Sequence, residues 1–191
     1  ALPISDLIAD LAGRPPVVAL EHLPVAADLG LAPEVRRRVE AGEGRALRAS
    51  ARVVVTGVAA MPLLEPYGLA AGRISVVEPG TDRGSVAVPD EEGPVELLAV
   101  GTINHLKGYD VLLSALARLA SYDWTLTCAG SLERDRPAAI DVQGLAVTRG
   151  IGTRVHWVGD LDAAGLDASY QLAHVFVSAS RRETDRKSTR L

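Results

Sequence analysis

The sequence has little of several residue types that define special classes of protein. Its 191 residues include one cysteine, one methionine and one phenylalanine, and aromatic residues make up 4%. The single Cys128 excludes an intramolecular disulfide and suits a reducing cytoplasm. It lies in the apolar run "WTLTCAG", where we predict a buried thiol and not a nucleophile. No run of 18 uncharged apolar residues is present, so no membrane-spanning helix is predicted.

The sequence also lacks a large excess of charge of either sign, an apparent leader peptide and metal-binding patterns. The formal net charge is -4, which does not favour a general nucleic-acid-binding protein. No signal peptide is apparent, and the sole methionine is Met61. We therefore expect an internal piece of a longer protein. The four histidines show no ligand-like spacing with cysteine or acidic residues, so no metal is predicted.

What the sequence has is a regular alternation of short apolar runs and helical patterns. Strands are expected at 16–20, 51–57, 73–80, 95–101, 124–130, 154–159 and 174–180. Helices are expected at 4–12, 33–50, 58–68, 108–121, 135–149 and 162–172. Strict alternation of strand and helix predicts an α/β fold with parallel sheets. The strands are rich in valine and leucine, as expected when helices cover both faces.

One stretch interrupts the alternation. Residues 78–94, "EPGTDRGSVAVPDEEGP", are rich in proline, glycine and acidic residues, a composition typical of a linker. Three expected strands precede it and four follow. We therefore predict one α/β unit at 1–78, a linker at 79–94 and a second unit at 95–184, with neither unit complete.

The segment "VELLAVGTINHLKGYDVLLSALARLA" places a lysine where a buried strand gives way to a helix. In open α/β sheets, ligands bind beyond the carboxyl ends of the strands. Helix N-termini there carry partial positive charge and stabilise phosphate groups. Lys107 adds a full charge, and Gly108 lacks a side chain, so a ligand could approach the backbone. This pattern predicts a site for an anion such as a diphosphate. A solvated surface lysine is the alternative.

The segment "LLAVGTINHLKGYDVLLSALARL" resembles the donor-site segment of GT-B fold glycosyltransferases of family 4, the large retaining group. "RISVVEPGTDRG", "WTLTCAGSLERD", "RVHWVGDLDAAGLDASYQLAHVFVSAS" and "SRRET" resemble further segments of that family in the right order. Upstream, "LEHLPVAADLGL" and "EGRALRASARVVVTG" are similar to the end of its acceptor-side domain. The resemblance covers 15–184 and implies two Rossmann-like units, the end of an acceptor-side domain at 1–78 and a truncated donor-binding domain at 95–184.

The resemblance also implies an activity. Family members move a hexose from a nucleoside-diphosphate sugar to a hydroxyl acceptor (a sugar, glycan or glycolipid) with retention, generally without a metal. Positive groups then stabilise the leaving diphosphate. Many members work at the bilayer surface, so a peripheral membrane position stays open here. The alternatives are a non-catalytic nucleotide-sugar-binding domain and another GT-B enzyme such as a sugar-nucleotide epimerase. A dinucleotide-dependent oxidoreductase is disfavoured, because no strand-borne Gly-x-Gly-x-x-Gly appears.

Residues that match the family's donor motifs are expected to bind the nucleotide sugar. They are Gly101, Thr102, Lys107, Gly130, Ser131, Leu161 and Glu183. Lys107 is expected on the diphosphate. Thr102 stands where the family often has arginine, so it brings a hydroxyl and no charge. The alternative is a loop residue whose hydroxyl forms a hydrogen bond with its own backbone. The glycines that end strands are alternatively simple turn residues.

Two residues are expected to take part in catalysis. His22, in "EHLP", matches a cleft histidine of the acceptor-side domain, and a structural histidine is the alternative. Glu183 matches the first of two glutamates separated by seven residues, and a surface glutamate is the alternative. The second glutamate would fall at Leu191. His156 and His174 lie within strand patterns and are expected to be packing residues.

The chain's last residues depart from the family's pattern. After "SRRET" the sequence gives the polar run "DRKSTRL" at 185–191, which cannot supply the buried face of a helix. We expect this tail to be non-native, such as read-through of a cloning or sequencing adapter. A genuine but divergent ending is the alternative. We also expect this chain by itself to have little or no transferase activity.

Overall fold

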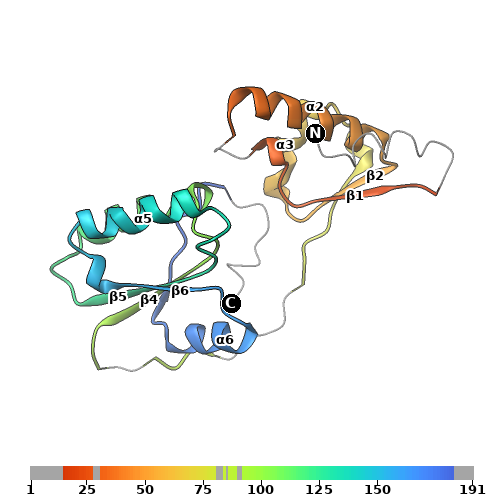
Figure 1. Cartoon of the computed structure of the whole chain (residues 1–191). Coiled ribbons are helices and arrows are strands. Elements are labelled where there is room, and N and C mark those ends of the chain that lie inside the picture. The colour runs from red at the N-terminus through yellow and green to blue at the C-terminus, as the bar shows by residue number, and fades with distance from the viewer. Residues whose placement is uncertain (1–14, 28–30, 81–83, 85, 90–91, 183–191) are drawn as a thin grey trace. The chain divides into compact units, whose positions relative to one another are not determined.

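The computed structural model describes residues 15–27, 31–80, 84, 86–89 and 92–182 (Figure 1). The helix expected at 4–12, Glu183 and the segment 185–191 lie outside the described residues. Contacts divide the chain between Thr81 and Asp82, inside the range expected to be a linker. Each unit is described by itself below.

In its described residues, the first unit has a parallel sheet and one long helix. Strands β1 (Val18–Glu21), β2 (Arg52–Val55) and β3 (Ile74–Val76) pair in the order β1-β2-β3. Helix α2 (Pro33–Ala49) begins at a proline, a residue suited to the first turn because its missing N–H has no partner there anyway. The buried cluster joins the helix to the sheet; it consists of Leu47, Val53, Val55, Ala60, Leu64 and Tyr67.

The helix expected at 58–68 is not continuous. A 3-10 turn (Val58–Ala60), the short α3 (Met61–Leu64) and a second 3-10 turn (Glu65–Tyr67) follow one another. Prolines lie in the first turn of both later pieces, and a proline removes a helix hydrogen bond and crowds the preceding turn. The segment ends at Gly68, which has a φ of 63°.

The second unit is a larger parallel sheet. Strands β4 (Val95–Val100), β5 (Trp124–Ala129), β6 (Val155–Gly159) and β7 (Val175–Phe176) lie in the order β6-β5-β4-β7. All pairs are parallel. The carboxyl ends of these strands therefore meet at one edge, and the central β4 carries its loop to the middle of that edge.

Helices cover both faces of the second sheet. The helices are α4 (Tyr109–Ala117), α5 (Arg136–Thr148) and α6 (Ala163–Leu172). Helices α5 and α6 lie on opposite faces (Figure 1). Asp135 and Asp162 cap α5 and α6, because their carboxylates accept hydrogen bonds from Ala138 N and Gly165 N. These two acceptors satisfy backbone N–H groups that a helix N-terminus otherwise leaves unpaired.

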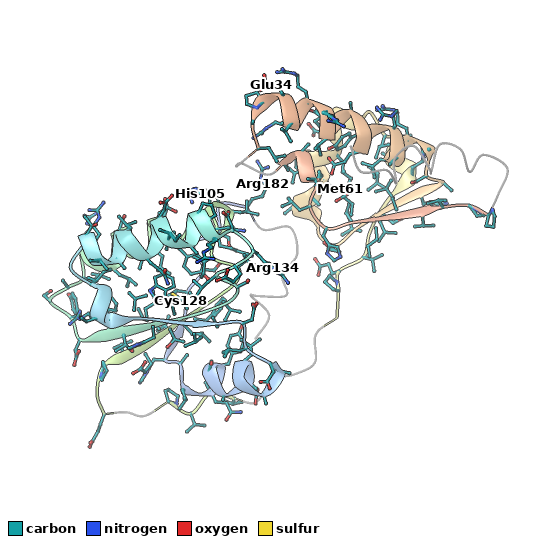
Figure 2. All side chains as sticks on the ribbon, viewed as in Figure 1. Glu34, Met61, His105, Cys128, Arg134 and Arg182 are labelled. Atoms are coloured by element: carbon teal, nitrogen blue, oxygen red, sulfur yellow. The ribbon has the colours of Figure 1, made fainter. Side chains whose placement is uncertain are left out.

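The core of the second unit lies between the sheet and the helices α4 and α5. Among its residues are Ile103, Leu113, Leu116, Trp124, Leu126, Cys128, Val142 and Ile151. Figure 2 shows Cys128 on the sheet below α5. Its side chain is buried, and burial raises the pKa of the thiol to about 12. The prediction of a buried thiol is therefore confirmed, and its raised pKa disfavours the nucleophilic thiolate.

The α/β fold with two parallel sheets is confirmed, and each expected strand is present. The two histidines expected to pack inside are exposed, however. His156 lies on an outward-facing position of β6, because alternate residues of a strand point to opposite faces. His174 precedes β7, and its Nδ1 accepts a hydrogen bond from Glu96 N. Within the described ranges, no helix has the length and apolar character needed to cross a membrane.

Candidate donor-nucleotide site

Glycines end three neighbouring strands of the second sheet. Gly101 follows β4, Gly130 follows β5, and Gly159 is the last residue of β6. Their loops are hydrogen-bonded side by side: Gly101 N donates to Ala129 O at 2.8 Å, and Gly130 N donates to Gly159 O at 2.7 Å. A Cβ on Gly130 would lie 2.1 Å from the Gly101 carbonyl oxygen. Close backbone approach therefore requires glycine at position 130, whereas a Cβ on Gly159 would meet open space.

Lys107 lies over the first of these glycines. It ends a 3-10 turn (His105–Lys107) whose start is capped by Asn104, because Asn104 Oδ1 accepts from Lys107 N at 3.0 Å. A Cβ on Gly101 would lie 3.2 Å from Lys107 Cε, so the aliphatic part of the lysine packs against that glycine. The sequence pattern predicts Lys107 at the start of the helix. In the structure it lies one step earlier, separated from α4 by Gly108 in the left-handed conformation.

Gly108 does not offer its backbone to a ligand in the way expected from the sequence. It has a φ of 66°, and a Cβ on it would lie 2.1 Å from the carbonyl oxygen of Ala179. The space is filled by the loop that follows β7. The expectation that a ligand approaches the backbone where Gly108 lacks a side chain is therefore wrong. The missing side chain instead allows two loops to pack closely.

Two further hydrogen bonds, one from Tyr109 and one to the loop after β5, hold the loop after β4 in place. The hydroxyl of the buried Tyr109 donates to Gly101 O at 2.8 Å. Ile103 N donates to Ser131 O at 3.0 Å. The Ser131 hydroxyl is buried and accepts from the backbone N–H groups of Glu133 and Arg134. Burial raises the pKa of Tyr109, which keeps its hydroxyl a donor. Thr102, between two such anchors, is half-buried.

The loop after β7 contacts the lysine turn through Arg181. Its guanidinium makes two bonds to the Asp110 carboxylate, Nη1 to Oδ1 at 2.8 Å and Nη2 to Oδ2 at 2.6 Å. Nη1 also donates to His105 O at 2.6 Å, and Arg181 N donates to Leu106 O at 2.8 Å. Figure 2 shows His105, Arg134 and Arg182, from the loops after three strands, on the same side of the unit.

Sequence reasoning missed three residues of this arrangement. Asn104 had a usable local signal, because asparagine is favoured at the start of a turn, where its side chain accepts a hydrogen bond from the backbone N–H two or three residues later. Tyr109 adjoins Lys107-Gly108, but its spacing alone indicates a core residue of the helix. Arg181 had no local signal, since it lies 71 residues from Asp110 in sequence.

The remaining predicted residues are not joined to this group by a described contact. Leu161 lies in the loop after β6, with 36% of its surface exposed. Its side chain packs near Gly165, where a Cβ would be 3.6 Å from Leu161 Cβ. His22 belongs to the first unit and follows β1, with its side chain exposed. Glu183 lies outside the described residues.

An acidic cluster lies beside His22 in the first unit. The Glu43 carboxylate accepts from Val25 N, from Ala26 N at 3.1 Å and from the Tyr67 hydroxyl at 2.7 Å. Burial and the charge of Glu43 raise the pKa of Glu21 to about 6, while His22 lowers it. The Glu43 carboxylate thus accepts three hydrogen bonds. Burial and the charge of Glu43 disfavour the ionised form of Glu21.

A cavity of about 400 Å³ lies elsewhere in the second unit, with Glu96, Leu98, Thr127 and His174 in its wall. None of the predicted donor-binding residues lines it. The strand-end loops are the better candidate for the site, because ligands of open α/β sheets bind beyond the strands' carboxyl ends. In the part of the chain that the structure describes, no group of three or more His, Cys, Asp or Glu side chains is placed to hold a metal ion.

Solved structures define the class of fold. Sucrose-phosphate synthase from Thermosynechococcus elongatus superposes with a TM-score of 0.72 at 24% identity, over 87% of this chain and 45% of that one. Anabaena HepE, solved in complex with UDP-glucose, gives a TM-score of 0.69 at 16% identity, over 90% of this chain and 48% of that one. The two parallel-sheet units are therefore of the GT-B type.

The chain belongs to the group 1 glycosyl transferases, because the model of that family matches residues 94–189. A D-inositol 3-phosphate glycosyltransferase from Jonesia denitrificans is 30% identical over 175 residues, 81% of this chain and 41% of the relative. The protein of that description from Streptosporangium roseum is 31% identical over 173 residues, 80% of this chain and 39% of the relative. The chain thus spans about two fifths of the length of these curated relatives.

Proposed function

We propose that this chain is part of a retaining glycosyltransferase of family 4 that moves a hexose from a nucleoside-diphosphate sugar to a hydroxyl acceptor. Membership of the group 1 family supports the transferase class. The observation that carries the donor site is the packing of Lys107 and Gly130 against Gly101, at the carboxyl edge of a parallel sheet. A cation and closely packed glycine loops at that edge suit a diphosphate.

Lys107 supplies the chemistry that the leaving group needs. Negative charge grows on the diphosphate as the bond to the sugar breaks, and a positioned ammonium group stabilises that charge more than it stabilises the bound donor. One charge-assisted hydrogen bond contributes about 1.5–3 kcal/mol, which is one to two decades in rate at about 1.36 kcal/mol per decade. Thr102 adds a hydroxyl from the same loop. We propose that no metal takes part.

The other predicted residues complete the proposal. Gly130, Ser131 and Leu161 belong to the loops around the nucleotide, His22 orients the acceptor hydroxyl, and Glu183 accepts hydrogen bonds from donor hydroxyls. The names of the curated relatives support an inositol phosphate as the first acceptor to test. The complex of HepE with UDP-glucose supports that nucleotide sugar as the first donor to test.

A thermal-shift panel tests the donor site. UDP, GDP, ADP and their sugars are added to the purified protein, each at saturating concentration. A ligand at 100 times its dissociation constant stabilises the folded state by about 2.7 kcal/mol, so one base should raise the melting temperature above the others. A flat panel on a protein that melts cooperatively contradicts the site. Transfer of labelled sugar by the full-length protein then separates a transferase from a domain that only binds nucleotide sugar.

A further inference from the structure

We infer that Arg181 is a positioning residue for Lys107: it fastens the turn that carries the lysine to the loop after β7, and so holds the ammonium group where the donor diphosphate binds. The inference rests on the proposed donor site. The contacts that support it join two loops that lie far apart in the chain.

The contacts bracket Lys107 on both sides. Before it, Arg181 binds the backbone carbonyls of His105 and Leu106, at 2.6 and 2.8 Å. After it, the guanidinium binds both oxygens of the Asp110 carboxylate. The side chain and backbone N–H of one residue thus contact both ends of the segment 105–110, which runs from the 3-10 turn into the first turn of α4. A single ion pair without the two carbonyl contacts would leave the turn able to pivot about Asp110.

Gly108 lets the two loops approach closely enough for this. The space of its missing Cβ is occupied by the Ala179 carbonyl oxygen, two residues before Arg181. The recess that remains between the loops is about 10 Å³, and Lys107 and Ser178 are among the residues lining it. That volume holds at most about one water molecule. The turn is therefore pressed onto the loop after β7, and Arg181 sets its orientation.

The pair is better suited to orientation than to stability. The Arg181 and Asp110 side chains are 33% and 40% exposed, and ion pairs this exposed contribute little to the folded state. Two parallel bonds from a planar guanidinium to a carboxylate fix direction as well as distance. The hydrogen bonds from Arg181 hold the pKa of Asp110 below its usual range, against the opposing effect of burial. Asp110 is therefore ionised at neutral pH, and both hydrogen bonds from the guanidinium fork of Arg181 to its carboxylate are kept.

The test is a double-mutant cycle on nucleotide affinity. UDP, GDP and ADP are titrated calorimetrically into the protein, and the tightest is carried through Arg181→Ala, Lys107→Ala and the double variant. Arg181→Ala should weaken binding about tenfold, since interacting residues couple by this order. On the Lys107→Ala background the same change should matter less than about twofold. Thermal melting of each variant confirms folding.

Three further variants sharpen the result. Arg154→Ala is the matched control, because Arg154 also donates to two backbone carbonyls, of Ala120 and Tyr122, and it should leave affinity unchanged. Arg181→Lys keeps the charge but not the fork, and should weaken binding nearly as much as alanine. Asp110→Asn breaks the pair from the other side and should also weaken binding, although it removes a negative charge.

Each other outcome overturns the inference. An equal loss on both backgrounds means that Arg181 acts independently of Lys107. Affinity restored by Arg181→Lys, or tightened by Asp110→Asn, means that charge and not geometry matters. In these cases nucleotide binding by the parent still supports the proposed function. If the folded parent binds none of the three nucleotides, the proposed donor site fails, and the inference fails with it.

Discussion

Gly108 and Ala179 lie in backbone contact, so close that a Cβ on the glycine would be 2.1 Å from the alanine carbonyl oxygen. The two residues come from the start of α4 and from the loop after β7. A backbone oxygen cannot move aside as a flexible side chain can. The contact therefore makes glycine a requirement at the base of the lysine turn, in addition to its left-handed φ of 66°.

Gly108→Ala should consequently destabilise the second unit by about 3 kcal/mol, since left-handed strain of about 1–2 kcal/mol adds to a steric clash. Gly150→Ala is the matched control. Gly150 has a φ of 73° but open space around its Cβ position, so only the strain of about 1–2 kcal/mol applies. Urea unfolding of both variants measures the difference. Equal losses would mean that the loops separate without cost.

The hydrogen bond from Tyr109 to Gly101 carries a second prediction. Tyr109→Phe leaves the partly buried Gly101 carbonyl without its 2.8 Å donor, at a cost of about 1–3 kcal/mol. Because that carbonyl borders the proposed site, nucleotide affinity should fall too. Tyr122→Phe is the control, since Tyr122 is 67% exposed. Chemical unfolding and nucleotide titration give the two readouts; unchanged values in both would remove Tyr109 from the support of the loop.

The strands and the donor turn could be predicted from local patterns. The runs at 95–101 and 124–130 are apolar and end in glycine, and their alternation with helical patterns predicts buried parallel strands with loops at one edge. The segment 58–68 shows the limit of such patterns. Its apolar spacing is helical, yet two prolines break it into short turns, because the cost of a missing backbone donor outweighs periodicity.

Contacts between distant loops could not be predicted in this way. Nothing near Gly108 in the sequence indicates that Ala179 fills the space beside it, so the glycine suggested ligand access. Arg181 lies in a charged run that is typical of a solvated surface, and its carboxylate partner is 71 residues away. Such pairings depend on strand order, which places β7 beside β4, and strand order has no local signature.

Lys107→Ala tests the residue on which the proposed chemistry depends. Loss of one charge-assisted hydrogen bond of about 1.5–3 kcal/mol should lower transfer efficiency by about one to two decades. Arg118→Ala removes a positive charge just after the same helix, at an exposed position, and should change little. Kinetics of the full-length protein with UDP-glucose measure both. Wild-type efficiency in Lys107→Ala would exclude the lysine from the donor site.

A last prediction concerns the pH dependence of the first unit. The pKa of Glu21 is raised to about 6 by burial and by the charge of Glu43, with His22 acting in the opposite direction. The folded state therefore holds this proton more tightly than the unfolded chain, whose glutamates titrate near 4.3. The free energy of unfolding falls with rising pH wherever the folded state binds more protons than the unfolded state. The penalty thus develops as pH rises from about 4.3 to 6 and is fully present at pH 7.

Glu21→Gln should remove that penalty, because an amide carries no charge to desolvate or repel. At pH 7 we expect the variant to be more stable than the parent by about 1–2 kcal/mol, the equivalent of a pKa displacement of this size. At pH 4 the two should be nearly equal, since Glu21 is then protonated in the folded state and mostly protonated in the unfolded state. Glu65→Gln, an exposed glutamate of the same unit, controls for the loss of one negative charge. Urea midpoints at both pH values measure the effect. A parent more stable than Glu21→Gln at pH 7 would show instead that a partner stabilises the Glu21 carboxylate in the folded state, and the pH dependence would then have the opposite sign.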